Sequence, residues 1–139
     1  MTEISFYVGK QDTLRDRLLL ACRLTQKAYD RGYHVYLHTD SLATSRQLDE
    51  LLWTASPSSF IPHALVQHAE QERVLIAHDY EPHEHCDYLI NVSNDIPSFF
   101  SRFVRMGEIL DQTPNLLTDG RKRYAYYRDR GYTLKYYQL

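Results

Sequence analysis

The sequence is short of the glycines from which nucleotide-binding loops are built. It has five glycines in 139 residues, and only Gly9 stands in the loop after the first predicted strand. A dinucleotide-binding fingerprint needs three glycines there, and a phosphate-binding loop needs Gly-Lys-Ser/Thr. The Gly-x-Ser-x-Gly elbow of a serine hydrolase is missing as well. We therefore expect no working nucleotide site and interpret Gly9-Lys10 as a turn.

Cysteines and long apolar runs are also scarce. Cys22 and Cys86 are far apart and match no metal-binding or redox spacing, so we expect small buried side chains in a reducing compartment. No apolar run approaches the roughly 20 residues that span a bilayer. The first ten residues lack the basic-then-apolar order of a signal peptide. These features predict a cytoplasmic protein that does not bind membranes.

The residues that are present have the composition of one globular domain covering residues 1–139. Hydrophobic residues make up 43% and charged residues 24%, which favours a folded chain over a disordered one. This length can bury a single core.

Predicted strands and helices alternate along the chain. Strand-like segments occur at 3–8, 33–40, 73–79, 87–93, 104–110 and 132–137. Helical segments occur at 13–31, about 42–55 and 113–130, with a short helix at 98–103 and a loop at 56–66. The alternation predicts an α/β fold: a single three-layer domain with a mostly parallel, Rossmann-like sheet and helices on both faces.

The segment "HDYEPHEHCD", residues 78–87, is rich in metal-ligand side chains. They are His78, Asp79, His83, Glu84, His85, Cys86 and Asp87. No family spacing is met, and a zinc site needs three or four convergent ligands. Two interpretations stay open: a solvated polar loop, or the site of a small metal-dependent hydrolase or nucleotide-binding protein.

The single tryptophan stands at the end of the second helix. On a helical wheel Leu48, Leu51 and Leu52 form the core stripe, and Trp53 falls outside it. Trp53 either folds back under the following loop or is an exposed anchor for a partner, because Trp is enriched among residues that dominate binding energy.

The C-terminal end is basic and rich in tyrosine. Residues 121–139 carry a charge of +5 and six of the twelve tyrosines, whereas the rest of the chain carries −7. Leu117, Arg121, Tyr124 and Arg128 recur at helical spacing as one stripe. This stripe is an ordinary basic face, a nucleic-acid contact or the site of an acidic partner. We expect at most weak direct nucleic-acid binding, since the body of the chain repels phosphate.

Three segments resemble the chi subunit of bacterial DNA polymerase III: "LDELLW…P…SFIPH" from Leu48 to His63, the opening "ISFYV", and "RYAYYRDRGYTL" near the end. The resemblance covers nearly the whole chain. It implies a non-catalytic accessory subunit of the clamp-loader complex, which needs no cofactor and takes part in DNA replication. It also implies that Trp53 and Phe60, framed by Pro57, Ile61 and Pro62, contact the psi subunit, or a helicase that uses the same surface.

The resemblance further implies a pocket for the C-terminal tail of single-stranded-DNA-binding protein. That tail is acidic and ends in a phenylalanine carboxylate. By position, Leu117, Arg121, Tyr124 and Arg128 match this pocket. The best-known members have lysine where this sequence has Leu117 and Ala125, which puts the strength of tail binding in question.

Overall fold

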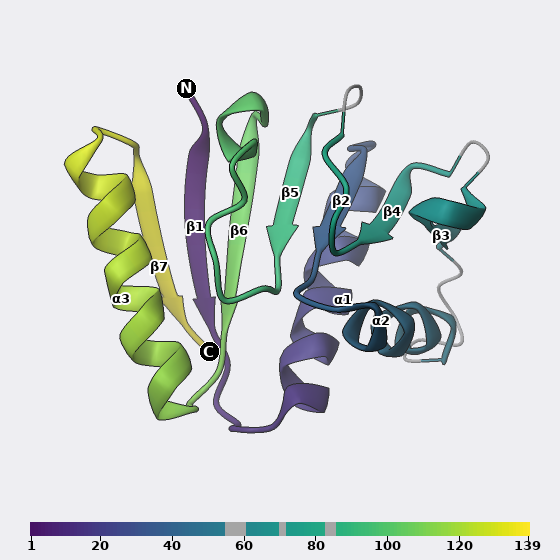
Figure 1. Cartoon of the computed structure of the whole chain (residues 1–139), viewed down its shortest axis with the longest axis horizontal. Coiled ribbons are helices and arrows are strands. Elements are labelled where there is room, and N and C mark those ends of the chain that lie inside the picture. Colours follow the sequence, from purple (N-terminus) through teal and green to yellow (C-terminus); the bar gives the residue numbers. More distant parts are fainter. Residues whose placement is uncertain (55–60, 70–71, 83–85) are drawn as a thin grey trace.

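The computed structural model describes residues 1–54, 61–69, 72–82 and 86–139, which form one seven-stranded sheet with helices on both faces (Figure 1). The strands are β1 (Glu3–Val8), β2 (Val35–His38), β3 (His63–Leu65), β4 (Val74–Ala77), β5 (Tyr88–Asn91), β6 (Arg105–Leu110) and β7 (Leu134–Gln138). The helices are α1 (Leu14–Asp30), α2 (Leu42–Thr54) and α3 (Pro114–Asp129), with short 3-10 turns η1 (Val66–His68) and η2 (Phe100–Arg102).

The sheet is parallel throughout, in the order β3-β4-β2-β5-β6-β1-β7. From β1 the chain crosses through α1 towards β2, and from β6 it crosses through α3 in the opposite direction to β7 (Figure 1). Right-handed crossovers in opposite directions place their helices on opposite faces of the sheet. The predicted three-layer α/β fold is confirmed.

Two apolar clusters hold the layers together. On one face Leu18 of α1 and Leu48 of α2 pack over the strands with residues such as Ile76. On the other face Tyr127 of α3 packs with Phe6 and with the phenylalanines around η2. Alternate residues of the strands therefore fill two separate cores.

The predicted loop at 56–66 was wrong in its last part, because β3 occupies residues 63–65. β3 is an edge strand that pairs in parallel with β4. Three residues that begin with a histidine give no strand periodicity, so the sequence carried little signal for it. The predicted short helix at 98–103 is the 3-10 turn η2.

Cys22 is buried, as expected, and burial raises the pKa of its thiol to about 12. Cys86 is only partly buried. None of the helices in the described ranges has a stretch long and apolar enough to cross a membrane.

Candidate functional site

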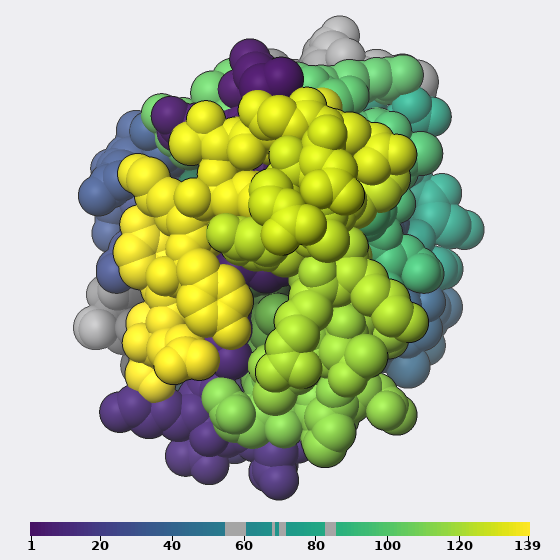
Figure 2. Space-filling model, turned by 90° about the vertical axis from the view of Figure 1, so that its left-hand side faces the viewer, coloured from purple at the N-terminus to yellow at the C-terminus, as the bar shows by residue number. Residues whose placement is uncertain are grey.

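A groove lies between α3 and β7, at one lateral edge of the sheet. Figure 2 shows it as a hollow between the two elements. Its volume is about 360 Å³. Its lining includes all four residues that the family resemblance implied for the tail pocket: Leu117, Arg121, Tyr124 and Arg128.

The floor of the groove comes from residues that the sequence did not single out. Phe6 of β1, Leu110 of β6 and Tyr136 of β7 join the α3 residues. The ring of Phe6 lies 5.3 Å from that of Tyr124 and 6.4 Å from that of Tyr136, centroid to centroid. The alternation in β1 and β7 was the available signal, because even-numbered residues of both strands face α3.

Two glycines shape the groove. A Cβ atom built on Gly120 would lie 2.6 Å from Cδ1 of Leu110, so glycine lets α3 approach the sheet closely. Gly131 has a φ of +83°, and it turns the chain from the end of α3 into β7. Together they set the width of the groove and close its far wall.

The groove is apolar inside and cationic at its rim. Leu117 and Tyr124 are partly buried against the core of this face. Arg121 and Arg128 are exposed, and Nη2 of Arg128 lies 3.3 Å from Oδ1 of Asp129. Ala125 also lines the groove between the two arginines. The groove thus suits a ligand with an apolar end and negative charges.

Trp53 lies at the opposite lateral edge of the sheet, beside the edge strand β3. The residue is 48% exposed, and its ring lies 4.3 Å from the ring of His63, centroid to centroid. His63 is buried, with its two ring nitrogens 2.7 Å and 3.0 Å from the backbone oxygens of Ile61 and Asp49. The indole therefore packs on a histidine ring held by two hydrogen bonds, while much of Trp53 faces solvent.

Of the companions predicted for Trp53, Ile61 and Pro62 lie in the described ranges. Ile61 is only 3% exposed and belongs to the core, so its side chain supports the surface from beneath. Pro62 is partly exposed. Pro57 and Phe60 lie outside the described residues.

The described members of the histidine-rich segment do not gather around a common point. Nε2 of His78 lies 3.7 Å from Oδ1 of its neighbour Asp79, whereas Asp87 accepts a hydrogen bond from the backbone N–H of His34. Within the described ranges no group of three or more His, Cys, Asp or Glu side chains could hold a metal. His83, Glu84 and His85 lie outside those ranges.

In related architectures nucleotides bind at the carboxyl ends of the strands, and in this chain backbone groups there are engaged in other hydrogen bonds. The loops after β1 and β6 diverge there, which makes it the topological switch point. Gly9 donates its backbone N–H to Leu110, and Asp16 donates its own to the hydroxyl of Thr13 at the start of α1. These amides are not free for a phosphate.

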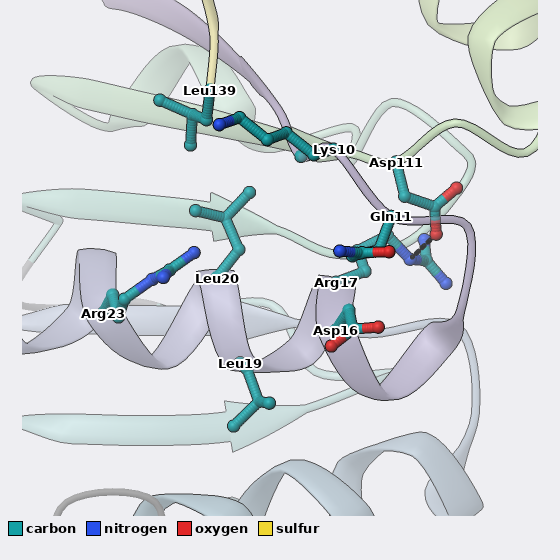
Figure 3. A pocket seen from close by; sticks show the side chains of 10 residues that line it. Lys10, Gln11, Asp16, Arg17, Leu19, Leu20, Arg23, Asp111 and Leu139 are labelled. Carbon is teal, nitrogen blue, oxygen red and sulfur yellow. Dashed lines mark ion pairs between the residues drawn. The ribbon is translucent and has the colours of Figure 1, made fainter.

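An ion pair stands at the same place (Figure 3). Nε of Arg17 lies 3.5 Å from Oδ2 of Asp111, and both side chains are almost completely buried. Burial lowers the pKa of Arg17, and the charge of Asp111 opposes that effect. The arginine therefore links α1 to the end of β6, and the carboxylate of Asp111 already compensates its charge.

Comparison with known proteins shows the family of the chain. The family model described as "DNA polymerase III chi subunit, HolC" matches residues 1–135. The chain belongs to the DNA polymerase III chi family. Members of this family are subunits of the replicative polymerase, so the chain is a protein of DNA replication.

Curated chi subunits match over nearly their whole length. The chi subunit of Pseudomonas aeruginosa is 34% identical over 139 residues, which is 100% of this chain and 98% of that protein. The chi subunit of Haemophilus influenzae is 30% identical over 132 residues, 93% of this chain and 92% of that protein. The chi subunit of Escherichia coli is 24% identical over 141 residues, 96% of each chain.

Proposed function

We propose that this chi-family protein bridges the clamp loader, through psi, to the acidic C-terminal tail of single-stranded-DNA-binding protein, and that it catalyses no reaction itself. The observation that carries the proposal is the groove between α3 and β7. It joins an apolar floor to a cationic rim, and the four residues that line up with the family's tail pocket all contribute to it.

The chemistry of the tail fits each part of the groove. The final phenylalanine enters beside Leu117 and Tyr124. Its carboxylate accepts paired, charge-assisted hydrogen bonds from an arginine of the rim, Arg121 or Arg128. The aspartates that precede it are attracted by the remaining cation. An ordinary basic helix face would offer the charges without the apolar slot.

The test compares two tail peptides in a fluorescence titration, one complete and one lacking its last phenylalanine. Burying a phenylalanine side chain contributes about 1.5–3 kcal/mol, so the shortened peptide should bind roughly ten- to a hundredfold more weakly. Arg121→Ala should weaken the complete peptide, and Arg46→Ala, on the exposed face of α2, is the matched control. Equal binding by both peptides would refute the pocket.

The second half of the proposal places psi, or a helicase that competes with it, on the surface around Trp53. A large indole that is half exposed and supported by His63 has the features of a binding anchor. Pro57 and Pro62 follow Trp53 in the sequence, and proline restricts the backbone, so less entropy is lost on docking.

The two surfaces are far enough apart to be used together. β3 and β7 are the two edges of the sheet, and six strand spacings of about 4.8 Å separate them by roughly 30 Å. A partner on each surface therefore leaves the other surface accessible. Two modest contacts on one rigid domain raise the local concentration of the polymerase at coated single strands.

Co-purification from the native cell tests this second surface. Trp53→Ala should lose the psi or helicase partner while keeping its affinity for the complete tail peptide. Leu42→Ala, at the start of α2, is a control that leaves the Trp53 side chain in place. Loss of both partners by a Trp53→Ala variant that is still folded would contradict two independent surfaces.

A further inference from the structure

A second hollow lies on the opposite face of the sheet, beside α1. Two adjoining cavities of about 480 Å³ and 380 Å³ share Leu139 in their linings. The larger one is lined by odd-numbered residues of β1 and β7, which point away from α3. Figure 3 shows the smaller cavity, with Lys10 and Leu139 across from Arg23 on α1. We call the two cavities together the α1 trough.

Positive charge is concentrated in the α1 trough. Six cationic side chains line it, beyond the Arg17–Asp111 pair: Lys10, Arg23, Lys27, Arg31, Arg105 and Lys135. Of the described residues that line the trough, Glu3 and Asp16 alone oppose them. Among the described residues none of these six cations forms an ion pair. A protein with a net charge of −2 therefore carries a strongly basic strip.

Flat aromatic rings stand between these cations. Tyr7 and Tyr137 are stacked with centroids 5.2 Å apart and an angle of 19° between the rings. Tyr137 is 42% exposed. The guanidinium of Arg105 lies 4.5 Å from the ring centroid of Tyr33. The α1 trough thus combines stacking surfaces with cationic side chains on one face of the sheet.

We propose that the α1 trough binds single-stranded nucleic acid without regard to sequence. The cations would contact the phosphates. The ring of Tyr137, stacked on Tyr7 with one face, would stack on an unpaired base with its other face. An acidic peptide could use the charges but would leave the tyrosine faces without a role. The proposal does not depend on tail or psi binding, because the groove between α3 and β7 is on the other face of the sheet.

This inference differs from the weak binding expected from the sequence, and the reason is the distribution of charge. The net charge of −7 over residues 1–120 hides five of the six cations. Lys10 comes from the loop after β1, Arg23 and Lys27 from α1, Arg31 from the end of α1, and Arg105 from β6. Folding brings them to one side together with Lys135 of β7. A phosphate in the α1 trough meets this local field more than the charge of the whole chain.

The experiment titrates a short fluorescent oligothymidine with the full chain at low salt and follows anisotropy. Contacts with three or four phosphates predict a slope of about −2 to −3 for log K against log salt concentration. Lys27→Glu combined with Arg31→Glu should weaken binding at least about tenfold at low salt. Tyr137→Ala should weaken it by about fivefold or more, since stacking on one base contributes about 1–3 kcal/mol.

The controls separate this site from general electrostatics and from the tail groove. Arg46→Glu with Lys122→Glu changes the charge equally at exposed positions outside the α1 trough and should retain most of the binding. An equal loss in both charge-matched pairs would overturn the proposal. So would displacement of the oligonucleotide by the tail peptide, or its loss in Arg121→Ala, because either result places the oligonucleotide in the α3–β7 groove. Tail-peptide binding by the Lys27/Arg31 variant, measured in parallel, shows whether the proposed bridging function stands independently.

Discussion

The Nε atom of Arg123 on α3 lies 3.1 Å from Oε2 of Glu108 on β6, and both side chains are buried in the layer between helix and sheet. The same carboxylate oxygen accepts a 2.6 Å hydrogen bond from the hydroxyl of Tyr127, and the other oxygen accepts one from the amide of Asn91. Burial raises the pKa of Glu108, while Arg123 and these hydrogen bonds act in the opposite direction. The network holds α3, and with it one wall of the groove, in a single position.

Glu108→Gln tests how much this network contributes to stability. Removing one partner of a buried ion pair leaves the other charge without compensation, which costs about 3–5 kcal/mol. We expect a loss near the lower limit, because Arg123 keeps a 2.9 Å hydrogen bond to Oδ1 of Asn94. Urea unfolding of this variant, of Arg123→Met and of the double variant gives the coupling energy. Additive losses would show that the two side chains do not act as a pair.

Much of the fold was predictable because its elements have strong local patterns. The strand at Glu3–Val8 and the helix at Leu14–Asp30 follow the predicted boundaries closely, since each shows a clear apolar period. β3 was missed because its pairing with β4 is a long-range contact without local periodicity. The buried pair Arg123–Glu108 could not be predicted either, since it depends on how α3 crosses the sheet.

The candidate site divides in the same way. The stripe of residues on α3 that ends in Arg128 could be predicted, because helical spacing places its members on one face. Phe6 and Tyr136 escaped notice because they reach the groove from strands that are far apart in sequence and adjacent only in the sheet. The α1 trough was hidden for the same reason, since its cations are dispersed over the chain and meet only through the order of the strands.

Gly120→Ala provides a second prediction, about packing. Alanine is better than glycine in a helix by about 1 kcal/mol, so an exposed site would gain stability. Here the new methyl group would meet Leu110, which is buried on the floor of the groove, so a shift of that side chain would change the groove itself. Overpacking costs about 1–3 kcal/mol, so we expect a lower Tm and weaker tail binding. Thermal unfolding of Gly120→Ala, Leu110→Ala and the double variant checks this. If Leu110 and the new methyl group clash, the double variant should lose less stability than the two single variants together. A loss equal to or greater than that sum would contradict the clash.

A third prediction concerns pH and His38 at the end of β2. Its ring meets Phe99 edge-on, and burial lowers the pKa of His38 below its usual 6.5, although Asp40 and Asp95 oppose the effect and His78 adds to it. The unfolded chain therefore binds this proton more readily than the folded chain does. The stabilisation is complete above pH 6.5 and is lost as the pH falls through the folded pKa.

Urea unfolding at several pH values between about 7 and 5, on either side of the usual pKa of histidine, measures this effect. The free energy of unfolding should fall with pH more steeply in the wild type than in His38→Gln. The variant corrects for carboxylates that titrate in the same range. Parallel pH profiles for the two proteins would exclude a contribution from His38.

The last prediction uses Ala125, which lines the groove together with Arg121 and Arg128 and stands where the family resemblance implies a lysine. Ala125→Lys should strengthen binding of the complete tail peptide about two- to fivefold, because an exposed ion pair contributes up to about 1 kcal/mol. The gain should shrink as salt is added, since salt screens exposed charges. Ala43→Lys, exposed on α2 and outside the groove, adds the same charge elsewhere and should change the affinity much less. If both lysines strengthened binding equally, tail binding would depend on net charge alone. That result would contradict the groove as the binding site.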